Sequence, residues 1–239
     1  MDLSIILPTY NERENIQNLV PKLQEFVKKS AIKSEILVVD DNSPDGTAEA
    51  ALKLNKRYGN VRVIRRQKKE GMGAAIKAGF DNARGDILLS MDVDSLGVSD
   101  MEKLLRKIKE GYDLVIGSRY LKRDLYKKKY FKTYVKNAIS FFGNKFARAM
   151  LGIKATDFSL NCRALKKGVW KKIKVKEKGN SFMLETVVEA HFNGFRIAEV
   201  PVIFKEREYG KSKLNLTKQS AKFLKNVLWY VFKYRVHVF

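Results

Sequence analysis

The first half of the chain alternates short apolar runs with stretches of helical periodicity. Runs rich in β-branched and apolar residues are typical of strands, and they fall at Leu3–Leu7, Glu35–Asp40, Val61–Arg65, Ile87–Asp92 and Leu114–Gly117. Helical spacing of apolar residues occupies the intervening stretches, at about 12–29, 47–58, 74–83 and 100–109. Strands that alternate with helices predict βαβ units. The sequence therefore predicts an α/β fold, a mostly parallel sheet flanked by helices on both faces.

The pattern changes after residue 120. Residues 130–151 predict one or two basic amphipathic helices, a polar patch (ATDFSLNCR) covers 155–163, and a helix around 181–192 precedes a strand at 195–204. The tail 216–236 places apolar residues on one helical face, at Phe223, Leu224, Val227, Leu228, Val231 and Phe232. We expect its first two turns to pack on the core. Its last turns (WYVFKYRVHVF) carry aromatic and basic residues and are typical of a membrane-interface segment.

Polar side chains follow three of the predicted strands, in PTYNE at 8–12, DDNSPDG at 40–46 and DVDS at 92–95. The carboxyl ends of parallel strands meet at one edge of a sheet, where ligands bind. Asp92 and Asp94 are hard oxygen ligands suited to Mg²⁺ or Mn²⁺; the alternative is that they are turn and cap residues. Asp40 and Asp41 stand at the end of the second predicted strand, and one carboxylate at such a strand end can accept a hydrogen bond from a nucleobase, while Asp45 or Thr47 is placed to cap the next helix.

The stretch EGMGAAIKAG superficially resembles a dinucleotide-binding fingerprint. It has Gly71 and Gly73 but Ile76 at the third glycine position, and it follows the third predicted strand instead of the first. We interpret it as a close-packed turn that opens a helix, and reject a dinucleotide site.

Composition and charge narrow the function further. The chain has 239 residues, 45% of them hydrophobic, which is enough for a globular core. Its one cysteine, Cys162, excludes an internal disulfide framework and fits a reducing compartment. The amino terminus does not have the pattern of a signal peptide, and no apolar run approaches eighteen residues, so we expect a soluble or peripheral protein.

The formal net charge is +22, and it is not spread evenly along the chain. Ten Lys and Arg face one acid, Asp124, between Arg119 and Arg148, and aromatic residues are interleaved with them. Such density indicates a polyanionic neighbour, which could be nucleic acid, an anionic membrane or a phosphorylated substrate. The alternative is a lysine-rich surface that serves solubility or heat tolerance.

Together, the runs SIILPTYNERENI, EILVVDDNSPDGT, GMGAAIKAGF, GDILLSMDVDS and YDLVIGSRY resemble the GT-A glycosyltransferases of family 2. GSRY, DFSLNCRALKKGVW and FRIAEVPVIFKEREYGKSKLN resemble the branch that mannosylates dolichyl or other polyprenyl phosphates. The resemblance covers nearly the whole chain. It implies a GT-A catalytic domain over 1–215 with basic membrane-facing helices within 120–151, and an amphipathic juxtamembrane helix over 216–239.

The resemblance also implies roles for particular positions. The nucleoside of a nucleotide-sugar donor would be held by Pro8, Tyr10, Glu12, Val39 and Asp41. Mg²⁺ or Mn²⁺ on the donor diphosphate would be bound by Asp92 and Asp94, which flank Val93 in the donor site. The diphosphate would be neutralised by Arg119, Arg207 and Lys213, and the acceptor phosphate by Arg119, Lys132 and Lys136. The catalytic candidates are Asp94, Arg119 and Arg207.

The sequence departs from the pattern of the family at several positions. Leu96 stands where a Gln usually follows the metal motif, and Lys132 and Lys136 stand where an Arg and a Ser are usual. Lysine binds phosphate as a point charge, without the bidentate geometry of arginine. SLNCR at 159–163 also replaces the more usual Ser-Gly-Phe-Arg. These changes bear on the donor and acceptor, and leave the expected fold unchanged.

The implied reaction is an inverting, in-line transfer of a hexose to a polyprenyl or dolichyl monophosphate. A phosphate acceptor is already anionic and needs no strong base, whereas a hydroxyl acceptor would need a base such as Asp94. GDP-mannose is the expected donor, with UDP-glucose as the alternative, and a soluble or polysaccharide acceptor as a second alternative. The lipid acceptor implies a peripheral enzyme on the anionic cytoplasmic face of a membrane. The chain would then be either a short-form enzyme or one truncated before membrane-spanning helices. A nucleic-acid-binding protein is the remaining hypothesis, but acids at three strand ends would repel a phosphate backbone.

Overall fold

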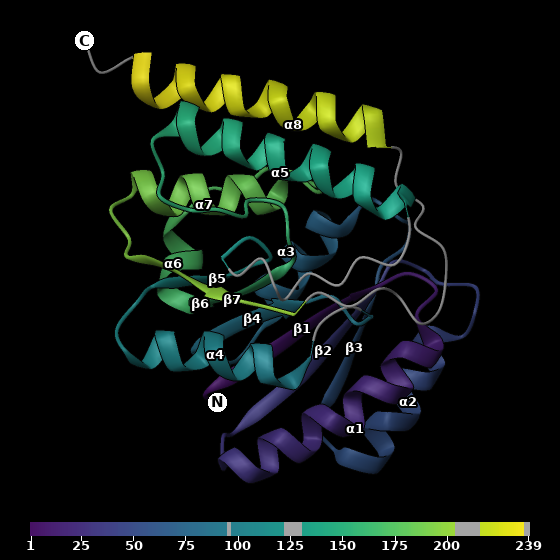
Figure 1. Ribbon diagram of the computed structural model, residues 1–239. Helices are drawn as coiled ribbons and strands as arrows, with labels where there is room; N and C mark the ends of the chain where they lie inside the picture. Colours follow the sequence, from purple (N-terminus) through teal and green to yellow (C-terminus); the bar gives the residue numbers. More distant parts are fainter. Residues whose placement is uncertain (95–96, 122–130, 204–215, 237–239) are drawn as a thin grey trace.

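A computed structural model describes residues 1–94, 97–121, 131–203 and 216–236 (Figure 1). Its strands are β1 (Leu3–Thr9), β2 (Ser34–Asp40), β3 (Val61–Arg65), β4 (Ile87–Met91), β5 (Leu114–Ser118), β6 (Cys162–Lys166) and β7 (Ile197–Pro201). Its helices are α1 (Arg13–Ser30), α2 (Thr47–Tyr58), α3 (Met72–Asn82), α4 (Val98–Lys109), α5 (Phe131–Leu151), α6 (Lys167–Lys172), α7 (Phe182–Phe192) and α8 (Leu216–Val231), and a π-helical turn, Phe232–Val236, follows α8.

The strands form one seven-stranded sheet in the order β3-β2-β1-β4-β6-β5-β7. Strands β1, β2, β3 and β4 are mutually parallel, and β7 is parallel to β5. Strand β6 runs antiparallel to both of its neighbours, β4 and β5. The predicted mostly parallel sheet with flanking helices is therefore confirmed. The five strands predicted in the first half are present, each within two residues of its predicted ends.

Helices cover both faces of the sheet and enclose two hydrophobic cores. The core on one face is built with α1, α2 and α4 and includes Ile16, Val20 and Leu104. The core on the other face is built with α3, α5, α6, α7 and α8 and includes Phe80 and Phe182. On this second face the helices are stacked in layers, with α7 nearest the sheet, α5 above it and α8 outermost (Figure 1).

Strand β6 and helix α6 are the elements that the sequence pattern did not predict. The strand lies in the middle of the sheet, where Leu88 pairs with Leu165 and Met91 with Cys162. Its insertion brings the polar patch before Cys162 to the carboxyl end of β4, since an antiparallel strand begins where its neighbour ends. The fold thereby adds a fourth segment to the edge where the three predicted polar clusters meet.

The turn before α3 is close-packed, as expected. A Cβ on Gly73 would lie 2.5 Å from the Cβ of Phe182, and a Cβ on Gly71 would lie 2.7 Å from the carbonyl oxygen of Lys178. Gly71 also has a φ of +113°, which disfavours residues with side chains. These glycines allow the start of α3 to approach the chain before α7, which accounts for them without a dinucleotide site.

Helix α8 turns part of its apolar surface outward. Val227 and Tyr230 are buried against the core, whereas Leu224, Leu228 and Trp229 are 40%, 52% and 53% exposed. In these later turns only one side of the helix faces the core, and the expectation for its first two turns stays a prediction. Within the parts of the chain that the structure describes, no helix is long and apolar enough to cross a membrane.

Candidate active site

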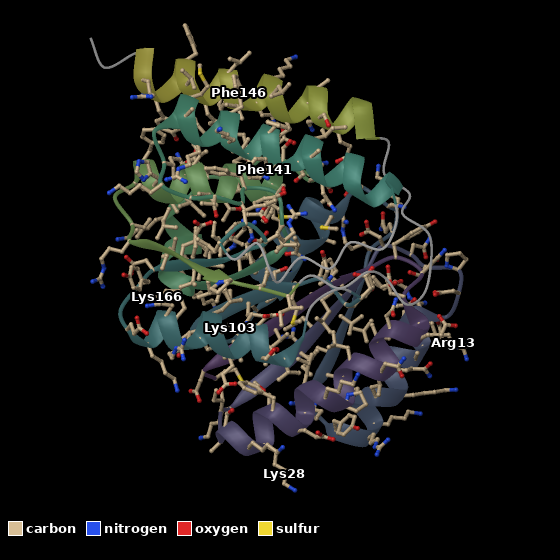
Figure 2. The ribbon with its side chains drawn as sticks, in the orientation of Figure 1. Arg13, Lys28, Lys103, Phe141, Phe146 and Lys166 are labelled. Carbon is tan, nitrogen blue, oxygen red and sulfur yellow. The ribbon has the colours of Figure 1, made fainter. Side chains whose placement is uncertain are left out.

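The carboxyl ends of β1 and β2 are fastened to each other. In the parallel register Thr9 lies beside Asp40, and the amide of Asp41 donates to the carbonyl of Thr9 at 3.0 Å. In the loops that follow, the amide of Asn11 donates to the hydroxyl of Ser43 at 2.9 Å. Two of the predicted polar clusters therefore form one interlocked surface. Arg13, at the start of α1, lies at this side of the molecule, and Lys28, near the other end of the helix, lies away from it (Figure 2).

Asp40 and Asp45 hold the loops of this surface in shape. Asp40 is fully buried and accepts hydrogen bonds from the amide of Ser43 at 2.9 Å and from its hydroxyl at 2.5 Å. Asp45 accepts hydrogen bonds from the amide of Thr47, the first residue of α2, at 3.0 Å and from the amide of Arg13, the first residue of α1, at 3.2 Å. Asp45 thus accepts from the first amide of both helices, although the N-cap positions themselves are Gly46 and Glu12 and provide no side-chain cap.

Asp41 is the acid of this cluster that lies beside a cation. Its carboxylate pairs with Arg66, which also pairs with Glu70 at 2.5 Å, and Asp41 and Arg66 are 5% and 12% exposed. Burial raises the pKa of Asp41, and the charge and hydrogen bonds of Arg66 only partly oppose that shift. The site predicted to face a nucleobase is therefore a carboxylate–guanidinium pair at the end of β2 and β3.

The other residues expected at the nucleoside have different surroundings. Tyr10 lies under the ammonium group of Lys69, with 3.7 Å between the nitrogen and the ring centroid, so a cation stacks on the aromatic face. Glu12 accepts a hydrogen bond from the side-chain amide of Asn15 at 2.6 Å. Pro8 is half-buried near the end of β1, whereas the side chain of Val39 is fully buried in the core.

Asp92 and Asp94 follow β4 directly, and the valine between them is buried in the core. The side-chain amide of Asn161 donates to Oδ1 of Asp92 at 3.0 Å, and the amide nitrogen of Asp92 donates to the carbonyl of Asn161 at 3.2 Å. A pocket of about 570 Å³ opens beside Asp94, between α1 and the start of α4. It is lined by charged, polar and apolar side chains that include Lys22, Glu25, Phe26 and Val98.

The chemistry of this pair fits a divalent cation. Mg²⁺ is usually bound by one or two carboxylates together with substrate phosphates and water. The described residues contain no group of three or more His, Cys, Asp or Glu side chains that could hold a metal by themselves. Asp92 and Asp94 would therefore hold the cation jointly with the phosphates of a bound donor, and Asn161 already fixes one carboxylate oxygen of the pair.

Arg119 follows β5 and is held in a buried ion pair. Its Nε and one terminal nitrogen donate to the two carboxylate oxygens of Asp157 at 2.7 and 3.0 Å, and it also donates to Ser159 at 2.7 Å and to Ser140 of α5 at 3.2 Å. Asp157 is fully buried and Arg119 is 10% exposed. Burial opposes ionisation of Asp157, but the charge and hydrogen bonds of Arg119 outweigh it and lower the pKa of this carboxyl.

Several predicted site residues are not placed. Leu96, Arg207 and Lys213 lie outside the residues that the structure describes. Lys132 and Lys136 belong to the first turns of α5, but the positions of their side chains are likewise outside the described part. Their predicted roles at the donor and the acceptor phosphate therefore remain predictions.

The structure adds residues that sequence reasoning did not single out. Arg66 and Lys69 follow β3 in the run RRQKK, which stands at the same strand edge and could have been included on that ground. Asp157 and Asn161 belong to the polar patch whose role depends on β6. Since β6 was not predicted, neither residue could be assigned to this edge.

A family model for glycosyl transferase family 2 matches residues 4–174. The chain is 38% identical over 219 residues to polyprenol monophosphomannose synthase of Mycolicibacterium smegmatis, covering 88% of this chain and 80% of the relative. It is 36% identical to undecaprenyl-phosphate mannosyltransferase of Micrococcus luteus, over 90% of this chain and 88% of the relative. It is 34% identical to dolichol-phosphate mannosyltransferase of Pyrococcus furiosus, over 90% of this chain, and spans 59% of the length of that protein.

The fold is also that of solved glycosyltransferases. Glucosyl-3-phosphoglycerate synthase of Mycobacterium tuberculosis, crystallised with Mn²⁺, uridine diphosphate and phosphoglyceric acid, superposes with a TM-score of 0.71 at 18% identity, covering 96% of this chain and 78% of that one. This structural likeness supports the predicted GT-A fold, and the sequence identities to the mannosyltransferases and the family model assign the family. The chain is a glycosyltransferase and belongs to glycosyl transferase family 2.

Proposed function

We propose that this enzyme transfers mannose from GDP-mannose to a polyprenyl monophosphate such as dolichyl phosphate, at the cytoplasmic surface of a membrane and with inversion at the sugar. The observation that carries this proposal is the 34–38% identity, over about nine-tenths of the chain, to relatives named for mannose transfer to polyprenyl, undecaprenyl or dolichyl phosphates. The polar strand ends and the outward apolar helices of the structure are consistent with it.

The chemistry requires two polyanions to meet. An oxygen of the acceptor phosphate forms a bond to the anomeric carbon while the bond from that carbon to the donor diphosphate breaks, and GDP leaves with the electron pair. The acceptor oxygen is already anionic at neutral pH, so no base is required. The residues need only hold both substrates in line and stabilise charge on the leaving group.

Each group of site residues supports one part of this reaction. Asp92 and Asp94 would hold Mg²⁺ or Mn²⁺, which when bound neutralises the donor diphosphate. Arg119, with Arg207 and Lys213, would contact phosphate oxygens, and Asp157 orients the guanidinium of Arg119. Lys132 and Lys136 would contact the acceptor phosphate. The nucleoside would lie at the joined loops after β1 and β2, near Tyr10 and Asp41.

The membrane part of the proposal is supported by the outer helices. Exposed large apolar side chains gather on α5 and α8, at Ile139, Phe141, Phe142, Phe146, Leu224, Leu228 and Trp229. Phe232 follows α8 and is 55% exposed. Figure 2 shows Phe141 and Phe146 on α5, in the layer next to α8. We call this the α5/α8 face. Lys225 is exposed on α8 as well, which suits anionic headgroups, whereas Lys222 and Lys233 are paired with Glu177 and Glu189.

The activity is tested by incubating the protein with dolichyl phosphate in lipid vesicles, radiolabelled GDP-mannose and Mn²⁺, and counting label in the lipid phase. We expect metal-dependent transfer that Asp94→Asn abolishes. Glu110→Gln serves as the control, because Glu110 is an exposed carboxylate just after α4 that pairs with Lys107. Transfer from UDP-glucose instead of GDP-mannose, or to a soluble acceptor instead of the lipid, would refute the proposed donor or acceptor.

The membrane surface is tested separately by sedimentation with vesicles that contain anionic lipid. Leu228→Lys should weaken sedimentation because Leu228 is 52% exposed on the α5/α8 face. Leu52→Lys is a matched control, since Leu52 is 49% exposed on α2, across the sheet. Equal sedimentation of both variants and the wild type would remove the α5/α8 face from the proposal.

A further inference from the structure

Asn161 lies at the point where the antiparallel strand β6 begins beside the end of β4. The register pairs Met91 with Cys162, which places Asn161 next to Asp92. Asn161 is 2% exposed, so its side chain is removed from solvent and its polar atoms depend on protein partners. Ser90 of β4 and Asp92, which follows the strand, provide those partners.

The side-chain amide of Asn161 joins two residues of the metal-bearing segment. Its Nδ2 donates to Oδ1 of Asp92 at 3.0 Å, and its Oδ1 accepts from the hydroxyl of Ser90 at 2.7 Å. A carboxylate can only accept, so the NH₂ group must face Asp92, which leaves the amide oxygen to accept from Ser90. The hydroxyl of Ser90 therefore fixes which way the amide points, and the amide fixes the rotation of the Asp92 carboxylate.

The segment that carries Asn161 is held firmly. Arg163 is fully buried and donates to the carbonyls of Leu160 and Met183, each at 3.0 Å. Asp157, four residues before Asn161, is held in the buried pair with Arg119. The bridge to Asp92 is thus anchored on both sides by buried charged groups, and it cannot be displaced without disturbing either β6 or the end of β5.

We propose that Asn161 is a positioning residue that pre-orients Asp92 for the divalent cation. This inference rests on the proposed function in one respect, because it takes Asp92 as a metal ligand. A carboxylate whose rotation is already fixed loses less freedom when a cation binds, and residues that orient metal ligands typically contribute about 10- to 100-fold to metal affinity. Asn161 does so without contacting the substrates.

The direct test is a Mn²⁺ titration followed by electron paramagnetic resonance, with GDP present and no sugar donor or acceptor. Asn161→Ala removes the amide but keeps the backbone hydrogen bond from Asp92. We expect Mn²⁺ binding to weaken by about 10- to 100-fold. Asn144→Ala is the matched control: Asn144 is also 2% exposed and hydrogen-bonded, to the amide of Phe158 at 2.7 Å, and its loss should leave Mn²⁺ affinity unchanged.

A second readout separates positioning from a general structural effect. The Mn²⁺ concentration for half-maximal transfer should rise in Asn161→Ala, and activity should recover at saturating Mn²⁺. Reduced activity at every Mn²⁺ concentration with unchanged Mn²⁺ affinity would overturn the inference.

If Asn161→Ala does not fold, Ser90→Ala decides, because it keeps Asn161 and removes only the hydroxyl that orients the amide. Unchanged Mn²⁺ affinity in that variant would overturn the inference, and weakened affinity would support it. Absence of Mn²⁺ binding in the wild type would instead overturn the metal role of Asp92 and Asp94 in the proposed function.

Discussion

Replacing Asp157 with alanine should destabilise the protein more than any comparable change at a surface carboxylate. Asp157 is fully buried and accepts two hydrogen bonds from the guanidinium of Arg119. It also accepts from the amides of Ser159 and Leu160, at 3.1 and 3.2 Å, and so closes the turn that leads to β6. The substitution removes the counter-charge of Arg119 and the acceptor of this turn together.

The size of the stability loss follows from the buried charge of Arg119 that remains in the variant. Arg119 is only 10% exposed, so in the variant its charge stays largely out of water and has lost the carboxylate with which it pairs. Breaking a buried ion pair by removing one partner typically costs about 3–5 kcal/mol. Since small domains are stable by about 5–15 kcal/mol, the variant should retain only part of its stability and unfold at clearly lower urea concentration.

Equilibrium urea unfolding followed by circular dichroism measures this loss. Glu110→Gln is the control, because the pair of Glu110 with Lys107 is 43% and 32% exposed and should contribute about 0–1 kcal/mol. A loss in Asp157→Ala no larger than in Glu110→Gln would show that the Arg119 pair is not a main support of this region. The premise that Asp157 fixes Arg119 for phosphate would then fail as well.

Two further outcomes follow from close packing and from titration. Gly85→Ala should destabilise the protein by about 1–3 kcal/mol, because a Cβ on Gly85 would lie 2.5 Å from the backbone nitrogen of Ser4. Gly168→Ala should leave the stability unchanged, because a Cβ on Gly168 would meet nothing within 4 Å. Urea unfolding measures both variants, and equal stabilities would contradict the expected steric clash at Gly85. Burial of Glu35 opposes its ionisation, but hydrogen bonds from Ser4 and Arg62 and the charge of Arg62 outweigh it and lower its pKa below the ordinary 4.5. The stabilisation from ionised Glu35 is present above pH 4.5 and is lost as pH falls through the lower pKa of the folded state. In Glu35→Gln the free energy of unfolding should therefore fall less steeply with decreasing pH than in the wild type. An unchanged dependence of the unfolding free energy on pH would refute this role of Glu35.

The pattern of apolar runs in the sequence was sufficient to predict the parallel part of the sheet. Strands β1, β2 and β4 are apolar runs with few interruptions, as expected for strands buried on both faces, and their polar ends could be assigned to one edge by the rule for parallel sheets. That rule explains why Asp41, Asp92 and Asp94 could be selected from the sequence alone. Their partners could not be selected in the same way.

Strand β6 shows why the partners were missed. It reads CRALK, with two basic residues in five, and Arg163 is fully buried because it donates to backbone carbonyls that only the folded chain brings near. Its pairing with β4 joins residues more than seventy positions apart, such as Ile87 and Lys166. Local pattern carries no information on such pairing. Asn161 and Asp157 acquire their roles only through it.

The orientation of α8 has a similar cause. The π-helical turn that follows α8 lies against a buried carboxylate of α7: Glu189 accepts from Lys233 at 2.7 Å and from Tyr234 at 2.5 Å. Burial and the neighbouring charge of Glu185 raise the pKa of Tyr230, which is 2% exposed. Buried carboxylates must be satisfied by donors, so Lys233 and Tyr234 in the turn after α8 point inward. Leu228 lies on the outer side, although the sequence places it in the same apolar stripe as the buried Val227.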